Sequence, residues 1–191
     1  MIASAPMSPE GFDLPIVVSA PVAAEPLRVL VGSPLGTLAI DLVGETVTRL
    51  VIAPPAKDQK RYTPLAKIRR NDSLDEIIGR LSEYFAGVRK SPEIEFDLSA
   101  SGLDSFARRV LKETLRVPYG KTRTYQMLAE ACGRPDSYRQ VLSILLANPL
   151  PILIPCHRVV AKSSVGSYIA GARKKQWLQR LESQQGASSA D

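Results

Sequence analysis

The spacing of apolar residues changes near residue 100, and this change constrains the fold more than any other feature. Before it, apolar and polar residues alternate in short stretches with turn residues between them, at Leu27–Val31, Leu38–Leu42 and Val47–Ala53. Such stretches are typical of an antiparallel meander. After it, apolar residues recur at intervals of three or four, which is typical of helices. We therefore expect an α+β protein with a small N-terminal antiparallel sheet followed by a mostly helical domain.

The N-terminal part contains two further recognisable elements. A helix is expected over residues 71–87, where Ser73 and Glu76 have the spacing of a capping box. The alternation in Glu93–Leu98 predicts another strand, whereas Lys57–Arg70 is basic and irregular. No set of catalytic side chains is visible in this part.

The C-terminal part contains several helical patterns. They cover Ser105–Leu115, Tyr125–Cys132, a stretch from Asp136 or Ser137 to about Ala147, and Gly171–Glu182. The two middle helices are separated by a short turn with Gly133, which suggests a helix-turn-helix, although any corner between two helices gives this pattern. The apolar run Leu150–Pro155 predicts a strand.

The composition is that of a folded protein. Of 191 residues, 45% are hydrophobic and 23% charged, with a mean hydropathy of −0.03. No apolar run approaches the length of a membrane span. We expect a flexible leader over residues 1–26, one domain over 27–102, a second over 103–183, and a flexible tail over 184–191.

Positive charge is concentrated in the second domain. Residues 103–182 hold fourteen Lys and Arg against five Asp and Glu, within a net charge of +6 for the chain. This imbalance points to a polyanionic partner, most simply nucleic acid, with a solvated basic face as the alternative. The chain has two cysteines and no C-x-x-C pair, so we expect neither a disulfide framework nor structural zinc. The low number of cysteines and the lack of a disulfide framework fit a reducing cytoplasm.

The most distinctive segment joins Cys156 to His157, the chain's only histidine, with Arg158 next. A thiolate is the nucleophilic form of cysteine, and neighbouring bases lower its pKa. A productive contact between adjacent side chains requires a turn, which Pro155 favours. The alternative is a buried cysteine beside a surface histidine.

The surrounding residues form a longer pattern. Asn148 to Val160 reads Asn-Pro-Leu-Pro-Ile-Leu-Ile-Pro-Cys-His-Arg-Val-Val. Further matching positions are Phe106, Val117 to Thr122, Tyr125, Gly133, Pro135, Arg139, Gly166 to Tyr168, Gly171, Lys175, Trp177 and Glu182. With this pattern the chain resembles the O6-alkylguanine-DNA alkyltransferases, also called methylated-DNA–protein-cysteine methyltransferases. The match is strong from Phe106 to Glu182. The N-terminal sheet, ribonuclease-H-like in that family, fits only in outline through Ser33–Gly36.

The resemblance implies a repair reaction in which an alkyl group moves irreversibly, once per molecule, from guanine O6, and possibly from thymine O4, to Cys156. His157 would act through a water as the base, and Glu182 would orient it. Tyr125 would donate a hydrogen bond or proton toward guanine N3, and Asn148 would hold the turn that carries the cysteine.

The resemblance also implies a winged helix-turn-helix whose second helix enters the minor groove of double-stranded DNA. Arg139 would fill the space left by the extruded base. The other implied DNA contacts are Lys121, Arg123, Gln126, Arg134 and Pro135. The implied substrate pocket comprises Arg158, Val159, Val165, Gly166, Ser167, Tyr168, Ile169 and Ala170. Taken alone, Tyr125 would be a core aromatic residue, Arg139 a solvated charge and Glu182 a helix-end carboxylate.

The chain departs from the family pattern in two places. Leu142 and Ile144 follow Arg139 where small residues are usual, and Ile169-Ala170 stands where a small residue and glycine are usual, so DNA affinity and substrate range are open. The zinc ligands of some relatives are absent, so we expect no metal and no cofactor. We expect Cys132 to be structural.

Three functions are compared. The first is a single-turnover DNA alkyltransferase. The second is a non-catalytic binder of alkylated DNA that recruits other repair factors, and Cys156 argues against it. The third is a Cys-His hydrolase, which nothing outside the dipeptide supports. We expect a monomer, in the cytoplasm of a bacterium or associated with its nucleoid, that does not bind membranes.

Overall fold

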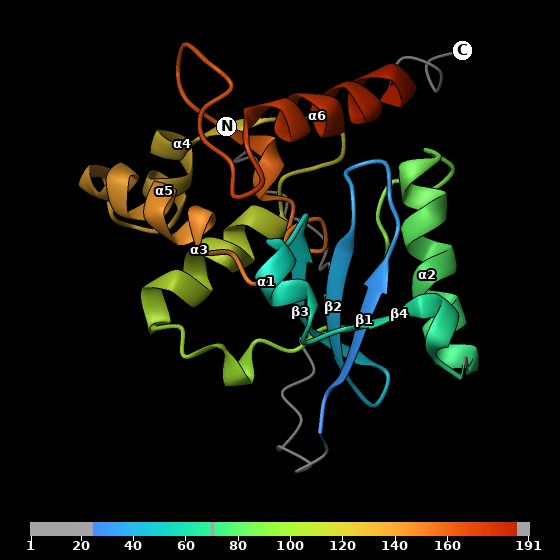
Figure 1. Ribbon diagram of the computed structural model, residues 1–191. Coiled ribbons are helices and arrows are strands. Elements are labelled where there is room, and N and C mark those ends of the chain that lie inside the picture. The colour runs from blue at the N-terminus through green and yellow to red at the C-terminus, as the bar shows by residue number, and fades with distance from the viewer. Residues whose placement is uncertain (1–24, 70, 187–191) are drawn as a thin grey trace, which may run out of the picture.

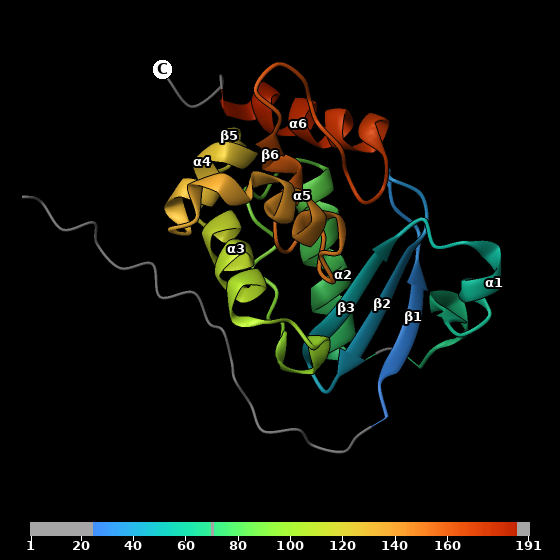
Figure 2. The same cartoon turned by 90° about the vertical axis from the view of Figure 1, so that its left-hand side faces the viewer.

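The computed structural model describes residues 25–69 and 71–186. The expected leader and most of the tail lie outside the described residues. Figures 1 and 2 show a small sheet on one side, a group of helices on the other, and α6 (Ala172–Gly186) lying across one end of both. Helix α6 continues past Glu182 into the segment expected to be a flexible tail. None of the helices within the described ranges is long and apolar enough to cross a membrane.

The three expected strands are confirmed as β1 (Leu27–Val31), β2 (Leu38–Val43) and β3 (Thr46–Ile52). They form an antiparallel meander, with the order β3-β2-β1-β4 in the complete sheet. Strand β4 (Thr63–Pro64) runs parallel to β1, so the sheet is mixed and not purely antiparallel as expected. This short strand lies in the segment that the sequence left irregular, together with α1 (Ala56–Gln59) and a 3-10 turn, η1 (Leu65–Lys67).

The expectation of a strand at Glu93–Leu98 is wrong. The segment makes one isolated bridge, from Phe96 to Val47, with Val47 N donating to Glu95 O and Asp97 N donating to Val47 O. The alternation is real, because Ile94 and Leu98 are buried and Glu93 and Glu95 exposed. It arises because the segment lies against the sheet without forming a further strand of it.

Helix α2 (Asp72–Phe85) begins with a different cap from the one expected. Asn71 is the N-cap and its side chain accepts from Leu74 N, whereas Ser73 Oγ donates to Glu45. The Ser73–Glu76 capping box is therefore wrong, since an earlier residue holds the cap position. A side-chain cap of this kind stabilises a helix by about 1 kcal/mol. The last turn of α2 reaches α6, where Phe85 contacts Trp177 with ring centroids 6.1 Å apart.

The helical part contains α3 (Ser105–Leu115), α4 (Tyr125–Ala131) and α5 (Tyr138–Leu146), close to the expected positions. Helix α3 packs against both α4 and α5. Short 3-10 turns lie at Ser99–Ser101 (η2), Pro135–Ser137 (η3) and Cys156–Arg158 (η4). A two-residue strand, β5 (Arg123–Thr124), pairs in parallel with β6 (Val159–Val160) just before α4. This pairing brings the start of α4 beside the segment that carries the cysteine.

One buried cluster connects the two parts. It joins Val29 and Ile40 of the sheet to Leu111 of α3 and to Ile154 beside the cysteine. At the edge of the sheet, Leu50 N donates to Pro149 O at 2.9 Å. The N-terminal part therefore supports the backbone around the candidate site directly.

Candidate active site

The segment before Cys156 is a tight turn, so the expected strand at Leu150–Pro155 is wrong. Pro151 and Ile154 form an isolated bridge, and Ile152 between them has a φ of 79°. Cys156 then begins the 3-10 turn η4, directly after Pro155. The turn expected at Pro155 is thus present. Burial, and not a place in a sheet, explains why this run is apolar.

Asn148 holds this turn closed. Its Nδ2 donates to Ile154 O at 3.0 Å and to Cys156 Sγ at 3.1 Å, and its Oδ1 accepts from Leu150 N at 3.0 Å. The side chain is buried, and all three partners belong to the turn. One amide therefore fixes both the turn and its sulfur atom.

The thiol of Cys156 is only 3% exposed. Burial raises the pKa of Cys156 to about 11, although the bond from Asn148 and the charge of Lys175 act in the opposite direction. The sequence predicted a pKa lowered by the neighbouring bases. In the structure, Nε2 of His157 and Nη2 of Arg158 bind Glu182. The resting thiol is therefore protonated near neutral pH and needs a base to react.

Glu182 on α6 is the centre of a buried polar network. His157 Nε2 lies 2.8 Å from Oε1, Arg158 Nε lies 2.9 Å from Oε2, and the backbone N of Gly120 donates to Oε2 at 3.0 Å. Tyr84 of α2 donates to Oε1 at 2.8 Å. Burial alone would raise the pKa of Glu182, but the bonds from His157 and Arg158 outweigh it and lower the value to about 2. Glu182 is therefore a carboxylate.

This carboxylate fixes the tautomer of His157. An ionised carboxylate only accepts hydrogen bonds, so Nε2 carries a proton and donates it to Glu182. Burial lowers the pKa of His157, so the neutral ring has its lone pair on Nδ1. Among the described residues, this buried Nδ1 has no hydrogen-bond partner. The arrangement leaves one basic nitrogen available beside the cysteine.

A second group of polar atoms surrounds Lys175, which is fully buried on α6. Its Nζ donates to the carbonyl oxygens of Val159 and Ser167 and lies 3.4 Å from the Tyr125 hydroxyl. Burial lowers the pKa of Lys175 to about 8, and the charge of Cys156 opposes this shift. Tyr125, at the start of α4, also donates to Ser167 O at 3.1 Å. Tyr125 and the 165–170 loop are thus held together.

The 165–170 loop packs tightly where it meets Tyr125. A Cβ on Gly166 would lie 2.6 Å from the Tyr125 hydroxyl, and its φ of +73° also favours glycine. Tyr168 is buried with its ring edge-on to His157 at a centroid distance of 6.4 Å. Ile169 is exposed, and Ala170 is half-buried. Both line a hollow that also includes Asn148 and strand β3.

The other predicted pocket residues differ in their positions. Val159 is buried at the end of η4, where its N donates to Cys156 O, and Val165 is half-buried. Arg158 is turned away from solvent, with Nη1 donating to Val117 O at 2.8 Å. Its role in the structure is therefore to hold Glu182 and the loop after α3.

The helix-turn-helix consists of α4, the turn η3 and α5. Arg139 is exposed on the first turn of α5, and within the described ranges its side chain is bonded only to the Tyr138 hydroxyl. Gln126 Nε2 donates to Pro135 O at 3.1 Å, which ties α4 to the turn. Arg134 covers the Phe106 ring at 4.4 Å.

The remaining residues of this region have clear positions. Lys121 is exposed and Arg123 is half-buried in β5. Leu142 and Ile144, the bulky residues noted from the sequence, are half-buried and pack against the core. Leu146, in contrast, is an exposed hydrophobic residue. Cys132 is a free, buried cysteine at the end of α4.

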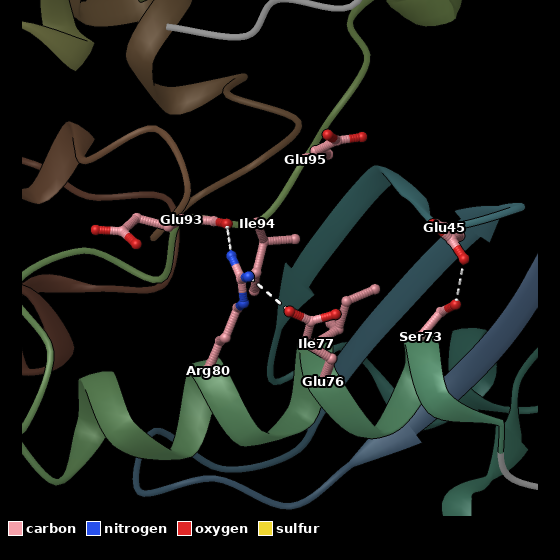
Figure 3. A pocket seen from close by; sticks show the side chains of 8 residues that line it. All are labelled: Glu45, Ser73, Glu76, Ile77, Arg80, Glu93, Ile94 and Glu95. Atoms are coloured by element: carbon pink, nitrogen blue, oxygen red, sulfur yellow. Dashed lines mark hydrogen bonds and ion pairs between the residues drawn. The ribbon is translucent and has the colours of Figure 1, made fainter.

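A separate hollow lies on the N-terminal part, between α2 and the segment around Glu93 (Figure 3). Its polar groups bind one another: Ser73 Oγ donates to Glu45 at 2.6 Å, and Arg80 contacts Glu76 and the Glu93 carbonyl. None of the predicted site residues lines it. Throughout the described ranges, no three His, Cys, Asp or Glu side chains are grouped so that they could hold a metal ion.

Sequence reasoning missed three contributors to the site. Lys175 was part of the matched pattern but had no assigned role. Gly120 acts through its backbone, which side-chain chemistry does not reveal. Tyr84 precedes Glu182 by 98 residues and lies in the part that showed no catalytic set. Its only signal was a tyrosine at a helix position that faces the core.

Comparison with known proteins extends these observations. Residues 105–184 match the family described as "6-O-methylguanine DNA methyltransferase, DNA binding domain". The methylated-DNA–protein-cysteine methyltransferase of Archaeoglobus fulgidus is 42% identical over 118 residues, 59% of this chain and 77% of that protein. The enzyme of that name from Mycobacterium leprae is 34% identical over 154 residues, 80% of this chain and 90% of its own.

Solved structures agree with the sequence matches. The crystal structure of Mycobacterium tuberculosis O6-methylguanine methyltransferase superposes with a TM-score of 0.72 at 30% identity, covering 87% of this chain and 96% of that chain. A crystal structure of Mycobacterium tuberculosis OGT in complex with DNA gives a TM-score of 0.70 at 30% identity, covering 82% and 92% of the two chains. The likeness therefore includes both the sheet and the helical part.

Proposed function

The chain belongs to the methylated-DNA–protein-cysteine methyltransferase family, and we propose on that basis that it repairs DNA by taking an alkyl group from guanine O6 onto Cys156. The observation that carries the assignment to Cys156 is its position: a buried thiol, held by Asn148, beside a histidine whose basic nitrogen has no hydrogen-bond partner in the part of the chain that the structure describes. This is the combination of nucleophile, base and orienting carboxylate that activates a weak nucleophile.

The chemical step is an in-line displacement. Sγ forms a bond to the alkyl carbon as the bond from that carbon to guanine O6 breaks, and the electron pair of the broken bond remains on guanine. The thiol proton passes through a water to Nδ1 of His157, and Glu182 stabilises the resulting imidazolium. The departing guanine takes a hydrogen bond or proton at N3 from Tyr125, whose hydroxyl lies near Lys175. The thioether product is not reversed by water, so each molecule reacts once.

Access to the thiol requires movement of the protein. Cys156 is almost fully buried. Burial, and after it the charge of Cys156, raises the pKa values of Tyr125 and Tyr168. A base stacked in a duplex cannot reach such a site, so the target nucleotide must leave the stack. The 165–170 loop is the segment that we expect to open and close over it.

The DNA is bound by the helix-turn-helix, with α5 in the minor groove of the duplex. Arg139 supports this orientation because it is exposed at the start of α5, where, within the described residues, its side chain bonds only the Tyr138 hydroxyl. Lys121, Arg123 and Arg134 provide positive charge near the same helices, while Gln126 and Pro135 shape the turn. The packing of Leu142 against the core removes part of the steric objection to close approach. We expect the protein to act as a monomer, in the cytoplasm or associated with the nucleoid.

The test is intact mass after incubation with an excess of duplex DNA that contains O6-methylguanine, followed by peptide mapping. We expect one added methyl group per molecule, on the peptide that contains Cys156. Cys156→Ser should abolish the transfer, and Cys132→Ser is the matched control that should retain it. A non-catalytic binder would hold the DNA without a mass change, and repeated turnover or a methyl group on Cys132 would exclude the proposed reaction.

A further inference from the structure

Tyr84 connects the N-terminal part to the reacting groups. It lies in the last turn of α2, and its side chain is fully buried. The hydroxyl donates to Glu182 Oε1 at 2.8 Å and lies 3.4 Å from His157 Nε2. A phenol is rarely buried without a hydrogen-bond partner, and here both neighbours belong to the catalytic pair.

The bond from Tyr84 competes with the bond from His157. Glu182 Oε1 accepts from the phenol, from His157 Nε2 and from Arg158 Nη2, whereas the backbone of Gly120 binds only Oε2. The phenol therefore draws negative charge away from the ring of His157. Inside a protein such a change in charge distribution has a large effect on the electrostatic interaction between Glu182 and His157, because the local dielectric constant is low. The charge on Oε1 in turn determines how readily His157 holds a second proton.

We propose that Tyr84 is a positioning residue of the alkyl transfer: its hydroxyl fixes the Glu182 carboxylate and thereby keeps His157 neutral, with its lone pair on Nδ1. This inference rests on the proposed function, because it assigns Tyr84 to the base that activates Cys156. It makes the N-terminal part of the chain a working component of the site and not only a support. Tyr84 acts through Glu182 and His157.

The other charged or titratable groups around His157 come from several elements. They are Tyr119 from the loop after α3, Cys156 and Arg158 from η4, Tyr168 from the 165–170 loop, and Lys175 and Glu182 from α6. Arg158 and Lys175 disfavour the imidazolium, while Glu182 favours it. Removal of the Tyr84 hydroxyl leaves all of these groups in place. It strengthens only the stabilisation of the His157 imidazolium by Glu182.

The decisive variant is Tyr84→Phe, which keeps the ring and its edge contact with Phe85. The measurement is the rate of Cys156 alkylation by free O6-alkylguanine base against pH, which avoids effects on DNA binding. We expect the midpoint of the acid limb to move up by about one pH unit, because His157 holds its proton more tightly. We expect the plateau rate at high pH to change by less than about threefold. A purely structural role would lower stability without moving the midpoint.

Two controls complete the experiment. Tyr62→Phe removes a phenol in the same part of the chain whose pKa is raised by burial and by Asp41, and we expect it to leave the midpoint unchanged. In a Glu182→Gln background, Tyr84→Phe should shift the midpoint no further, because the carboxylate through which it acts is gone. An unshifted midpoint in Tyr84→Phe, or an equal shift with and without Glu182, would overturn the inference. Failure of wild-type protein to become alkylated would instead refute the proposed function.

Discussion

Nδ2 of Asn148 lies 3.1 Å from Sγ of Cys156, and the same nitrogen donates to the carbonyl oxygen of Ile154. The sulfur is therefore fixed by the residue that closes the turn. A hydrogen bond donated to sulfur favours the thiolate over the thiol. Structure and reactivity at this position depend on a single amide.

Asn148→Ala should weaken both the fold and the reaction. The substitution leaves Leu150 N without its side-chain partner and removes one of the two donors to Ile154 O, which keeps its bond from Cys156 N. A buried group left unpaired costs about 1–3 kcal/mol. We expect a loss of about 2–5 kcal/mol in the free energy of unfolding, measured by urea denaturation. Transfer should slow in the protein that remains folded, because the thiol loses a donor. Normal rates at reduced stability would show that the amide serves only the turn.

Arg139→Ala should separate base extrusion from chemistry. The side chain bonds only Tyr138 within the described ranges, so the fold should be unaffected. Because extrusion of a base costs a few kcal/mol, we expect repair of duplex DNA to slow by about 10- to 100-fold. Reaction with free O6-methylguanine needs no extrusion and should change less than about twofold. Arg180→Ala, the same charge change on α6, is the control, and equal losses on both substrates would contradict the assignment.

The 165–170 loop should limit the size of the alkyl group. Ile169 and Ala170 stand where smaller residues are usual in the family, and both line the hollow that also includes Asn148. We therefore expect benzyl adducts to react more slowly than methyl adducts in the same DNA. Ala170→Gly should reduce the difference, because it removes a methyl group and frees the backbone. If benzylated and methylated DNA inactivate the wild type equally fast, crowding at this loop is excluded.

Stability should fall in two steps as the pH is lowered. The pKa of His157 is lowered by burial, so below about pH 6.5 the unfolded chain takes up a proton that the folded protein does not, and stability decreases. The pKa of Glu182 falls from 4.5 to about 2, so its contribution is complete above pH 4.5 and is lost as the pH drops toward 2.

Denaturation at a series of pH values tests this dependence. Glu182→Gln should be less stable than the wild type at pH 7, because Arg158 loses its charged partner in a buried site. It should also lose less stability between pH 4.5 and 2, since the group that titrates there is absent. Parallel curves for the two proteins would show that Glu182 does not control acid stability.

Local patterns predicted the helices and the three-stranded meander because each element shows its own periodicity. The prediction of β3 succeeded because its neighbours in sequence are its neighbours in space, although its buried residues, Val47, Leu50 and Ile52, do not alternate strictly. The wrongly predicted strands and the strand that was not predicted have one physical cause. Glu93–Leu98 and Leu150–Pro155 have the composition of strands, but whether such a segment pairs depends on backbone partners elsewhere in the chain. The short strand β4 was not predicted from the sequence for the same reason.

The candidate site was predictable only where chemistry is carried by side chains in one segment. Cys156 and His157 are adjacent, and the pattern around them named Asn148, Tyr125 and Glu182. Their distances were not predictable, and neither was the raised pKa of the thiol, because burial depends on the whole fold. The contribution of Tyr84 arises from a contact between parts of the chain that are 98 residues apart.

The near-complete burial of Cys156 has a consequence for the lifetime of the protein. A molecule that reacts once must avoid reacting with the wrong electrophile, since an accidental encounter removes it permanently. A protonated thiol, 3% exposed and with a pKa of about 11, is a poor target for oxidants and small alkylating agents in solution. Only a substrate that opens the site and engages the histidine meets a reactive sulfur. The burial thus protects the nucleophile of a protein that can react only once.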